Sequence, residues 1–277
     1  MKIKANAKIN FSLSVCGKRE DGYHLIDTVM HSVSLYDTVF IEKADEILVS
    51  CGDMPKEENI AYKAAKLFFE TAEISGGCKI EIEKQIPLSA GLGGGSADAA
   101  AVLLGLNKLY NTNFPYETLC NMALKLGADV PFFINGGCMR SEGIGEILTP
   151  AKPLNKGVIL LAKADLKPST AEMYRRLDEM ETVLADTNAV IKAIEENDLN
   201  KLSKNLYNAF ETVWPQSQVR AELLKTDAVA VALTGSGPTW FAVFDDIEKA
   251  DAAKKVLFEK KIPCWICYPT QKAIEFE

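Results

Sequence analysis

The most constraining feature of this chain is a run of four glycines within five residues, at Gly91, Gly93, Gly94 and Gly95. An alternating segment at 79–84 precedes the run, and an Ala- and Leu-rich segment at 97–110 follows it. Ordering so many glycines costs much chain entropy. Between a strand and a helix, glycines let backbone N–H groups approach phosphate oxygens, and the helix N-terminus adds a favourable dipole. The run therefore predicts a phosphate-binding loop rather than a flexible linker or a close-packed turn.

The sequence of this loop excludes two common nucleotide motifs. No Gly-Lys-Ser/Thr closes it, as a Walker A loop requires, and the sixth position counted from Gly91 is Ser96, where the dinucleotide fingerprint needs glycine. Ser96 can cap the helix or contact a phosphate or a metal through its hydroxyl. A second glycine turn, at 234–238, lies between two strand-like runs. Paired with the first loop, it is expected to form a second wall of the phosphate site.

Hydrophobic periodicity predicts the elements around these loops. Strict alternation over 2–15 indicates a half-buried strand with Lys8 and Asn10 on its polar face. Gly17 to Gly22 is expected to be a turn. After Pro150 the order of strands and helices is typical of an α+β fold, which places a domain boundary near residue 150, between domains 1–150 and 151–277. Further strands are expected at 32–42, 79–84, 158–162, 228–233, 239–244 and 264–268, and helices at 59–72, 97–110, 115–126, 171–184, 189–210 (broken near Asn197) and 247–260.

Charge and cysteine usage limit the partners. A net charge of −7 argues against a nucleic-acid or anionic-membrane partner, because both need a basic face. The seven cysteines are scattered and odd in number, which favours a reducing, cytoplasmic location. No apolar stretch reaches the roughly 18 residues of a membrane helix. We expect a monomer or a weak homodimer, and the Cys264–Cys267 pair is interpreted as part of a strand rather than as a redox site.

Three motifs in order give the sequence its resemblance: an N-terminal strand, the segment Pro87–Ser96, and the glycine turn Leu233–Pro238. With these it resembles the GHMP kinases (galacto-, homoserine, mevalonate and phosphomevalonate kinases). Four further segments are similar to a branch of that family whose substrate is an alcohol carrying a cytidine diphosphate group. They are Ala7–Asn10, Asp21–His24, Leu126–Pro131 and Glu142–Glu146.

The resemblance implies a fold and a reaction. The fold is a two-domain α/β arrangement of α+β type, with an N-terminal domain like ribosomal S5 domain 2 and a ferredoxin-like C-terminal domain. The reaction transfers the γ-phosphoryl group of ATP, with Mg²⁺, to the 2-hydroxyl of the cytidine-tagged alcohol, a step of non-mevalonate isoprenoid synthesis. No acidic residue is an obvious Mg²⁺ ligand, so ATP and water are expected to hold the metal.

By their positions in the matching motifs, Lys8 and Asp129 are the expected catalytic pair. Asp129 would accept or orient the proton of the substrate hydroxyl, while Lys8 would keep Asp129 ionised and offset charge on the transferred group. Without the motifs, Lys8 would be interpreted as a solvated strand lysine and Asp129 as a helix N-cap. Asn10, on the same strand face as Lys8, is expected to support the substrate.

The remaining predicted site residues bind the two reactants. Tyr23 can stack on a cytosine ring and His24 can hydrogen-bond its edge, although both could be ordinary turn residues. His31 has no matching motif and is interpreted as structural. Thr234 and Gly235 are predicted to contact the substrate. The predicted ATP-binding residues are Pro87, Leu88, Ser89, Ala90, Gly91, Leu92, Gly93, Gly94, Gly95, Ser96 and Ala97, with Asn59 and Lys84, which could instead be an N-cap and a strand-end charge.

Two other functions remain as alternatives. Another GHMP kinase, of mevalonate or homoserine type, would share the loop but would have no use for Tyr23 and His24 in a cytosine pocket. A non-catalytic RNA-binding module is the second, because part of this fold resembles ribosomal RNA-binding domains. The charge of −7 and the absence of an aromatic and basic stripe argue against it.

Overall fold

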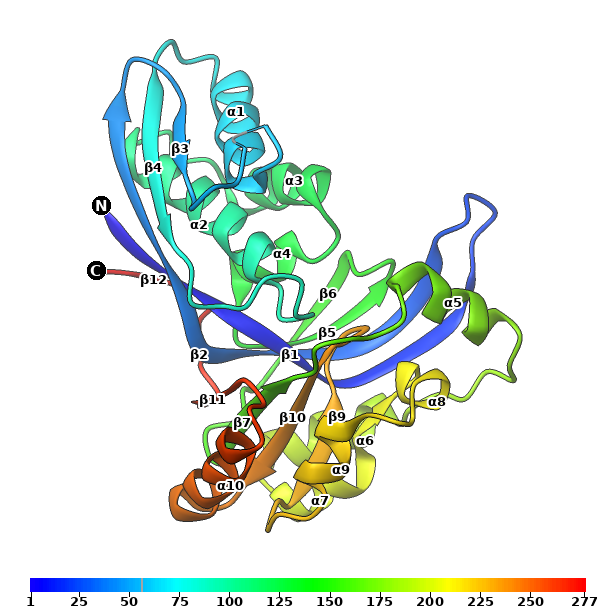
Figure 1. The fold of residues 1–277 in the computed structure, drawn as a ribbon. Helices are drawn as coiled ribbons and strands as arrows, with labels where there is room; N and C mark the ends of the chain where they lie inside the picture. The colour runs from blue at the N-terminus through cyan, green and yellow to red at the C-terminus, as the bar shows by residue number, and fades with distance from the viewer. Residues whose placement is uncertain (56) are drawn as a thin grey trace.

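Two β-sheets with helices packed against them make up the fold in Figure 1, in which the computed structural model describes residues 1–55 and 57–277. The larger sheet has the strand order β12-β1-β2-β4-β3, with β5 paired to β2, β6 to β5 and β8 to β1. The smaller sheet has the order β11-β7-β10-β9. Because strands and helices both pack into shared cores, this is the α+β arrangement that the sequence predicts.

The larger sheet carries four helices on its upper part in Figure 1. Its strands are β1 (Lys2–Lys18), β2 (His24–Ala44), β3 (Leu48–Ser50), β4 (Gly77–Glu83), β5 (Cys138–Gly143), β6 (Ile147–Ala151), β8 (Tyr207–Asn208) and β12 (Ile274–Phe276). The four helices are α1 (Ile60–Ala72), α2 (Gly94–Leu109), α3 (Tyr116–Leu126) and α4 (Val130–Asn135).

The smaller sheet forms the lower part of the molecule with most of the other helices. Its strands are β7 (Val158–Lys163), β9 (Ala230–Leu233), β10 (Thr239–Phe244) and β11 (Cys264–Cys267). The helices that follow β7 in the chain are α5 (Thr170–Asp178), α6 (Thr187–Glu195), α7 (Leu199–Asn205), α8 (Phe210–Val213), α9 (Gln218–Leu223) and α10 (Ile247–Glu259).

Strand β1 connects the two halves and is buried on both faces. Ile3 and Ala5 belong to the core that contains α2, whereas Phe11 packs edge-on against Phe241 of β10 at a ring distance of 5.7 Å. The polar face is also covered, because Lys8, Asn10 and Ser12 are buried. The prediction of a half-buried strand was therefore wrong, since alternation within one strand does not reveal that a second layer covers its polar side.

Several predicted boundaries differ from the observed ones. The first strand continues through Gly17, and β2 begins at His24 rather than at 32, so the turn between them is shorter than predicted. The helix predicted at 171–184 ends at Asp178, and the hairpin of β5 and β6 was not predicted. The predicted break near Asn197 is confirmed, because this residue has a φ of 54° between α6 and α7.

The chain returns to its starting strand. Strand β12 pairs antiparallel with β1, with Ile3 opposite Phe276, so the two termini lie close together in Figure 1. Residue 150 lies in β6, which belongs to the larger sheet. The division into domains 1–150 and 151–277 stays a prediction.

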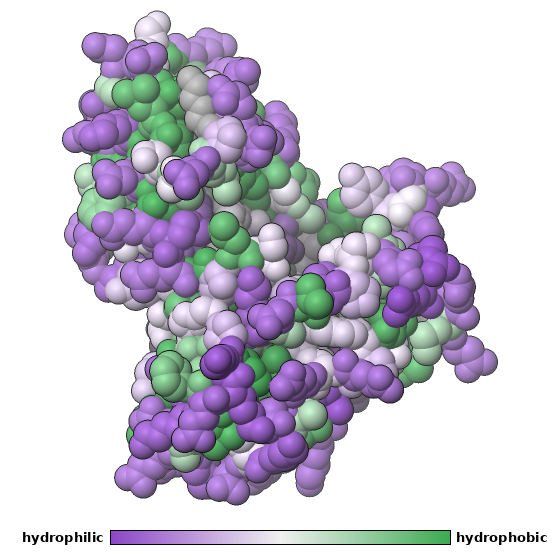
Figure 2. All heavy atoms as spheres, viewed as in Figure 1, coloured by the Kyte–Doolittle hydropathy of each residue, from purple (hydrophilic) through white to green (hydrophobic). Residues whose placement is uncertain are grey.

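The surface in Figure 2 is hollowed between the lobe of α1–α4 and the projecting end of β1 and β2 beside α5. Pale residues of intermediate hydropathy gather along this hollow, and strongly hydrophilic residues surround it. Over residues 1–55 and 57–277, no helix is both long and apolar enough to span a bilayer.

Candidate active site

The glycine loop wraps a cavity of about 280 Å³ at the start of α2. Residues 87–96 line it together with Ile60, Lys84 and Ile86. Helix α2 begins at Gly94, inside the glycine run rather than at the predicted residue 97, and its first internal bond runs from the N–H of Ala97 to the carbonyl of Gly93. The N–H groups ahead of Ala97 have no partner within the helix, so they are available to an anion.

Glycine is required at two points of this loop. Gly91 has a φ of 75°, and a Cβ there would lie 2.9 Å from the carbonyl oxygens of Thr234 and Gly237. Gly93 has a φ of 72°, and its Cβ would lie 2.5 Å from the ring of Phe133. A left-handed backbone and contacts this close exclude other residues. The loop and the turn 234–238 therefore touch, as expected for two walls of one site.

A hydrogen-bond network on β1 fixes the position of Lys8. The Lys8 Nζ donates to Oδ1 of Asn10 at 2.7 Å, and the same oxygen accepts from the hydroxyl of Thr234 at 3.2 Å and the backbone N–H of Gly235 at 3.0 Å. The Asn10 amide nitrogen donates to the hydroxyl of Thr28 at 2.8 Å. Asn10 and Thr234 are buried, so their side chains hold Lys8 against the glycine turn from inside the protein.

Asp129 faces Lys8 from the junction between α3 and α4. Its Oδ2 lies 3.8 Å from the Lys8 Nζ, and its side chain is 41% exposed whereas that of Lys8 is 5% exposed. Asp129 occupies the N-cap position of α4, yet its side chain makes no capping bond, so the helix does not occupy the carboxylate. Burial lowers the pKa of Lys8, and the charge of Asp129 opposes that change. The pair thus combines a fixed, buried cation with a carboxylate that a substrate can reach.

Lys84 lines the same cavity but is bound to two carboxylates. Its Nζ pairs with Asp37, and with Asp98 at 2.7 Å. Burial alone would lower the pKa of Lys84, but the charges of Asp98 and Asp37 outweigh burial and raise it. Burial also raises the pKa of Asp98 to about 7. Asp37 further accepts the backbone N–H groups of Gln85 and Ile86, so this cluster anchors the segment that leads into the glycine loop.

The other predicted nucleotide residues are less exposed. Asn59 is buried, and its amide oxygen caps α1 by accepting the N–H of Ala61 at 2.9 Å. Its neighbour Ile60, rather than Asn59, lines the cavity. Ala97 is buried within α2. The structure thus brings residues 87–96 and Lys84 to one cavity and leaves Asn59 and Ala97 behind its wall.

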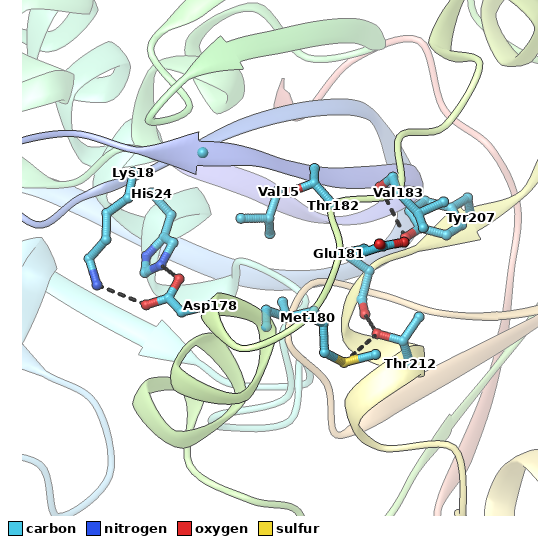
Figure 3. A pocket seen from close by; sticks show the side chains of 13 residues that line it. Val15, Lys18, His24, Asp178, Met180, Glu181, Thr182, Val183, Tyr207 and Thr212 are labelled. Carbon is cyan, nitrogen blue, oxygen red and sulfur yellow. Dashed lines mark hydrogen bonds and ion pairs between the residues drawn. The ribbon is translucent and has the colours of Figure 1, made fainter.

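A second group of predicted residues lies at the far end of β1 and β2. His24 stacks on Tyr174 of α5 at a ring distance of 4.2 Å and an angle of 17°. Its Nε2 hydrogen-bonds Asp178 at 2.7 Å, and Asp178 also pairs with Lys18 at 2.9 Å, as Figure 3 shows. Tyr23 is 61% exposed in the turn before β2. This end of the site therefore presents an aromatic wall with a polar edge.

Two observations relate this aromatic wall to its surroundings. Burial, and secondly the charge of Asp129, raise the pKa of Tyr174 to about 12, so Tyr174, which stacks on His24, also lies within electrostatic reach of the Asp129 carboxylate. A cavity of about 250 Å³ adjoins the wall, with His24 and Asp178 at one end and Tyr207 at the other (Figure 3). Tyr174 thus connects the predicted cytosine residues to the predicted catalytic pair.

Sequence reasoning missed four of these residues. Tyr174 and Asp178 lie on one face of α5 with Thr170, since the three recur every fourth residue, and this stripe was the available signal. Asp98 is a single acid in an otherwise Ala- and Leu-rich helix, a pattern that calls for a buried cation partner. Asp37 lies in a strand and gave no such signal.

The structure also shows what three other singled-out side chains do. His31 is buried, its Nε2 accepts the N–H of Leu154 at 2.9 Å, and burial lowers its pKa to about 4. These bonds make it a neutral structural residue, as predicted. Cys264 and Cys267 are free thiols in β11, and burial raises the pKa of both. Neither thiol has the lowered pKa of a redox cysteine.

Within the described ranges, 1–55 and 57–277, no three His, Cys, Asp or Glu side chains gather around a point that could hold a metal ion. Two oxygen groups at this site are open to a ligand: the hydroxyl of Ser96, which lines the cavity, and the carboxylate of Asp129, which is 41% exposed beside Lys8. Both are ligand types that Mg²⁺ accepts alongside phosphate oxygens and water.

Comparison with known proteins shows the family of this chain. Residues 59–137 match the family model of the GHMP kinases N terminal domain, and residues 190–262 match that of GHMP kinases C terminal. A 4-diphosphocytidyl-2-C-methyl-D-erythritol kinase from Clostridium botulinum (strain Eklund 17B / Type B) is 44% identical over 276 residues, which cover 96% of this chain and 99% of the relative.

Solved structures give the same picture. The crystal structure of a 4-(cytidine 5'-diphospho)-2C-methyl-D-erythritol kinase superposes with a TM-score of 0.84 at 33% identity, covering 96% of this chain and 98% of the other. A homoserine kinase from Cytophaga hutchinsonii has a TM-score of 0.74 at 19% identity, covering 99% and 96%. The second likeness shows the fold alone, and together the comparisons confirm the predicted fold class.

Proposed function

The chain belongs to the GHMP kinases, among their 4-diphosphocytidyl-2-C-methyl-D-erythritol kinases, and on this premise we propose that it phosphorylates the 2-hydroxyl of 4-diphosphocytidyl-2-C-methyl-D-erythritol with ATP. The reaction is a step of non-mevalonate isoprenoid synthesis, which we assign to the cytoplasm. The observation that supports this proposal most is spatial. The glycine loop lies against Lys8, Lys8 faces Asp129, and Asp129 lies within electrostatic reach of Tyr174, which stacks on His24.

The proposed chemistry uses the pair Lys8 and Asp129. The substrate oxygen attacks the γ-phosphorus of ATP, the bond to the β,γ-bridging oxygen breaks, and ADP leaves. Asp129 takes or orients the hydroxyl proton, because its carboxylate is the exposed one beside Lys8. The buried hydrogen bond to Asn10 already holds the Lys8 ammonium in place. Lys8 therefore stabilises the negative charge that develops on the transferred phosphoryl group without having to move.

The co-substrate is assigned to the glycine loop. The triphosphate would lie at the N-terminus of α2, and Lys84, with its partners Asp37 and Asp98, would hold the wall of the cavity. We propose that Mg²⁺ accompanies ATP, held by phosphate oxygens and water with the hydroxyl of Ser96 or the carboxylate of Asp129 within reach. Bound there, Mg²⁺ neutralises phosphate charge during transfer.

The cytidine group is assigned to the aromatic wall. Tyr23 is free to stack on a pyrimidine from the open side, while His24, held by Asp178 and Tyr174, presents a hydrogen-bonding edge. A mevalonate or homoserine kinase has no large ring to place there. An RNA-binding module would have no need of a buried lysine beside a free carboxylate.

Substitution of His24 by Ala tests the assignment of the cytidine group. Because His24 belongs to the proposed cytosine wall and does not line the glycine-loop cavity, the KM for the cytidine substrate should rise about tenfold or more while the KM for ATP changes little. Both constants are measured by ADP release. Tyr174→Leu removes the same ring stack and should give the same split, and an equal rise of both KM values would remove His24 from substrate recognition.

A further inference from the structure

Lys167, between β7 and α5, is held by hydroxyl groups. Its Nζ donates to the hydroxyl of Thr170 at 3.0 Å and to the hydroxyl of Ser236 at 3.3 Å. In the part of the chain that the structure describes, no carboxylate forms an ion pair with it. Burial is the only cause that lowers its pKa. A half-buried ammonium group that meets only neutral hydroxyls is an unfavourable arrangement unless an anion joins it.

The position of Lys167 places it at the reaction site. Ser236 is the middle residue of the glycine turn, and a Cβ on its neighbour Gly235 would lie 3.6 Å from the Lys8 Nζ and 3.3 Å from the carbonyl of Gly91. A Cβ on Gly237, the other neighbour, would lie 3.6 Å from Cδ of Lys167. Lys167 thus flanks the same short turn as Lys8.

Helix α5 connects this cluster to the aromatic wall. Thr170, whose hydroxyl also bonds that of Ser236 at 2.9 Å, is the first residue of α5. Tyr174 lies four residues later on the same helix face and stacks on His24. The cluster of Lys167, Thr170 and Ser236 therefore lies between the phosphate loops and the wall assigned to cytidine.

The cluster has more hydrogen-bond donors than acceptors. One of the two hydroxyls donates a hydrogen bond to the other, and each accepts one hydrogen bond from the ammonium group of Lys167. One N–H of the ammonium and one O–H remain without an acceptor inside the cluster. Two unused donors and an unpaired positive charge favour an anionic oxygen, and charge-assisted bonds of this kind are the stronger ones.

We propose that Lys167, with the hydroxyls of Thr170 and Ser236, binds a phosphate group of one of the two reactants, other than the phosphoryl that is transferred. The inference rests on the proposed function, because the phosphates available at this turn are those of ATP and of the cytidine diphosphate group. Lys8 remains assigned to the reacting phosphoryl. Lys167 acts in binding, so its loss changes affinity and leaves the chemical step in place.

Calorimetric titration with ATP and, separately, with CDP tests the proposal. In Lys167→Met, which keeps an apolar stem but no charge, one of the two dissociation constants should rise roughly tenfold, or about 1.4 kcal/mol. Lys167→Arg should retain most of the affinity. Lys255→Met, a matched control on the exposed face of α10, should bind both nucleotides like the wild type. The nucleotide that weakens identifies which reactant supplies the phosphate.

The outcomes separate this proposal from the proposed function. If Lys167→Met binds both ATP and CDP within twofold of the wild type, the phosphate site at Lys167 is refuted. An equal loss in the Lys255→Met control refutes it as well. If the wild type binds ATP but not CDP, the assignment to a cytidine substrate fails, and the ATP titration alone decides the role of Lys167. Unchanged unfolding temperatures in all variants exclude a purely structural effect.

Discussion

Lys8 and Asp129 have different roles within one ion pair because only Lys8 is buried. The lysine is fixed by Asn10 inside the protein, whereas the carboxylate is held 3.8 Å away with its side chain open to solvent. Water would weaken a pair exposed on both sides. With one member buried, the field at the carboxylate is stronger and its geometry is fixed, which suits a group that must meet a substrate hydroxyl.

The substitution Asp129→Asn should therefore separate binding from chemistry. The amide has nearly the same shape but cannot accept a proton, so kcat should fall by about a hundredfold or more. ATP binds on the glycine loop, and its dissociation constant should stay within about twofold. Pre-steady-state ADP formation and ATP titration measure the two effects. Asp251→Asn, on the exposed surface of α10, serves as the control, and a near-normal kcat in Asp129→Asn would remove this residue from the chemistry.

Single residues also mark the limit of prediction from sequence. Lys8, Asp129 and His24 could be named because each lies in a local motif. Tyr174 and Asp37 could not be named, because their roles depend on partners that are distant in the sequence. Tyr174 stacks on His24, 150 residues away, and Asp37 binds Lys84, 47 residues away. Asn59 and Thr234 were named by position, but the structure shows their side chains in buried structural bonds, which a local motif does not reveal.

The glycine loop and the turn 234–238 lie so close together that each limits which residues the other can carry. Position 91 requires glycine mainly because the carbonyl oxygens of the turn 234–238 leave no room for a Cβ. The sequence predicts a phosphate loop from the glycines before α2. It does not predict which glycine makes the contact between the loops, because that contact exists only after the two sheets have packed.

Gly91→Ala should destabilise the protein and weaken ATP binding. The new Cβ would meet the carbonyl oxygens of Thr234 and Gly237 at 2.9 Å with a φ of 75°, so we expect a loss of more than about 1 kcal/mol in the free energy of unfolding. Denaturant unfolding and ATP titration measure the effects. For unfolding, Gly95→Ala is the matched control, because its Cβ would lie 3.5 Å from Ile60 in a helical position and should not reduce stability. Equal losses in both variants would contradict this account.

The two sheets are joined through β1, and this connection decides where the site lies. The same strand carries Lys8 to the glycine loop and, at its far end, forms the hairpin with β2 that places His24 beside α5. Sequence periodicity gave most of the strands and helices of the molecule, but not the pairing of β12 with β1 or the hairpin of β5 and β6. Those pairings depend on contacts between distant segments, which periodicity does not encode.

The most direct measurement of the proposed function is ADP release by the purified protein with three acceptors: 4-diphosphocytidyl-2-C-methyl-D-erythritol, mevalonate and homoserine. The aromatic wall at His24 has a use only for the first, so its kcat/KM should exceed the other two by at least about a hundredfold. The absence of ADP release with the cytidine substrate, or a higher kcat/KM with mevalonate or homoserine, would contradict the account.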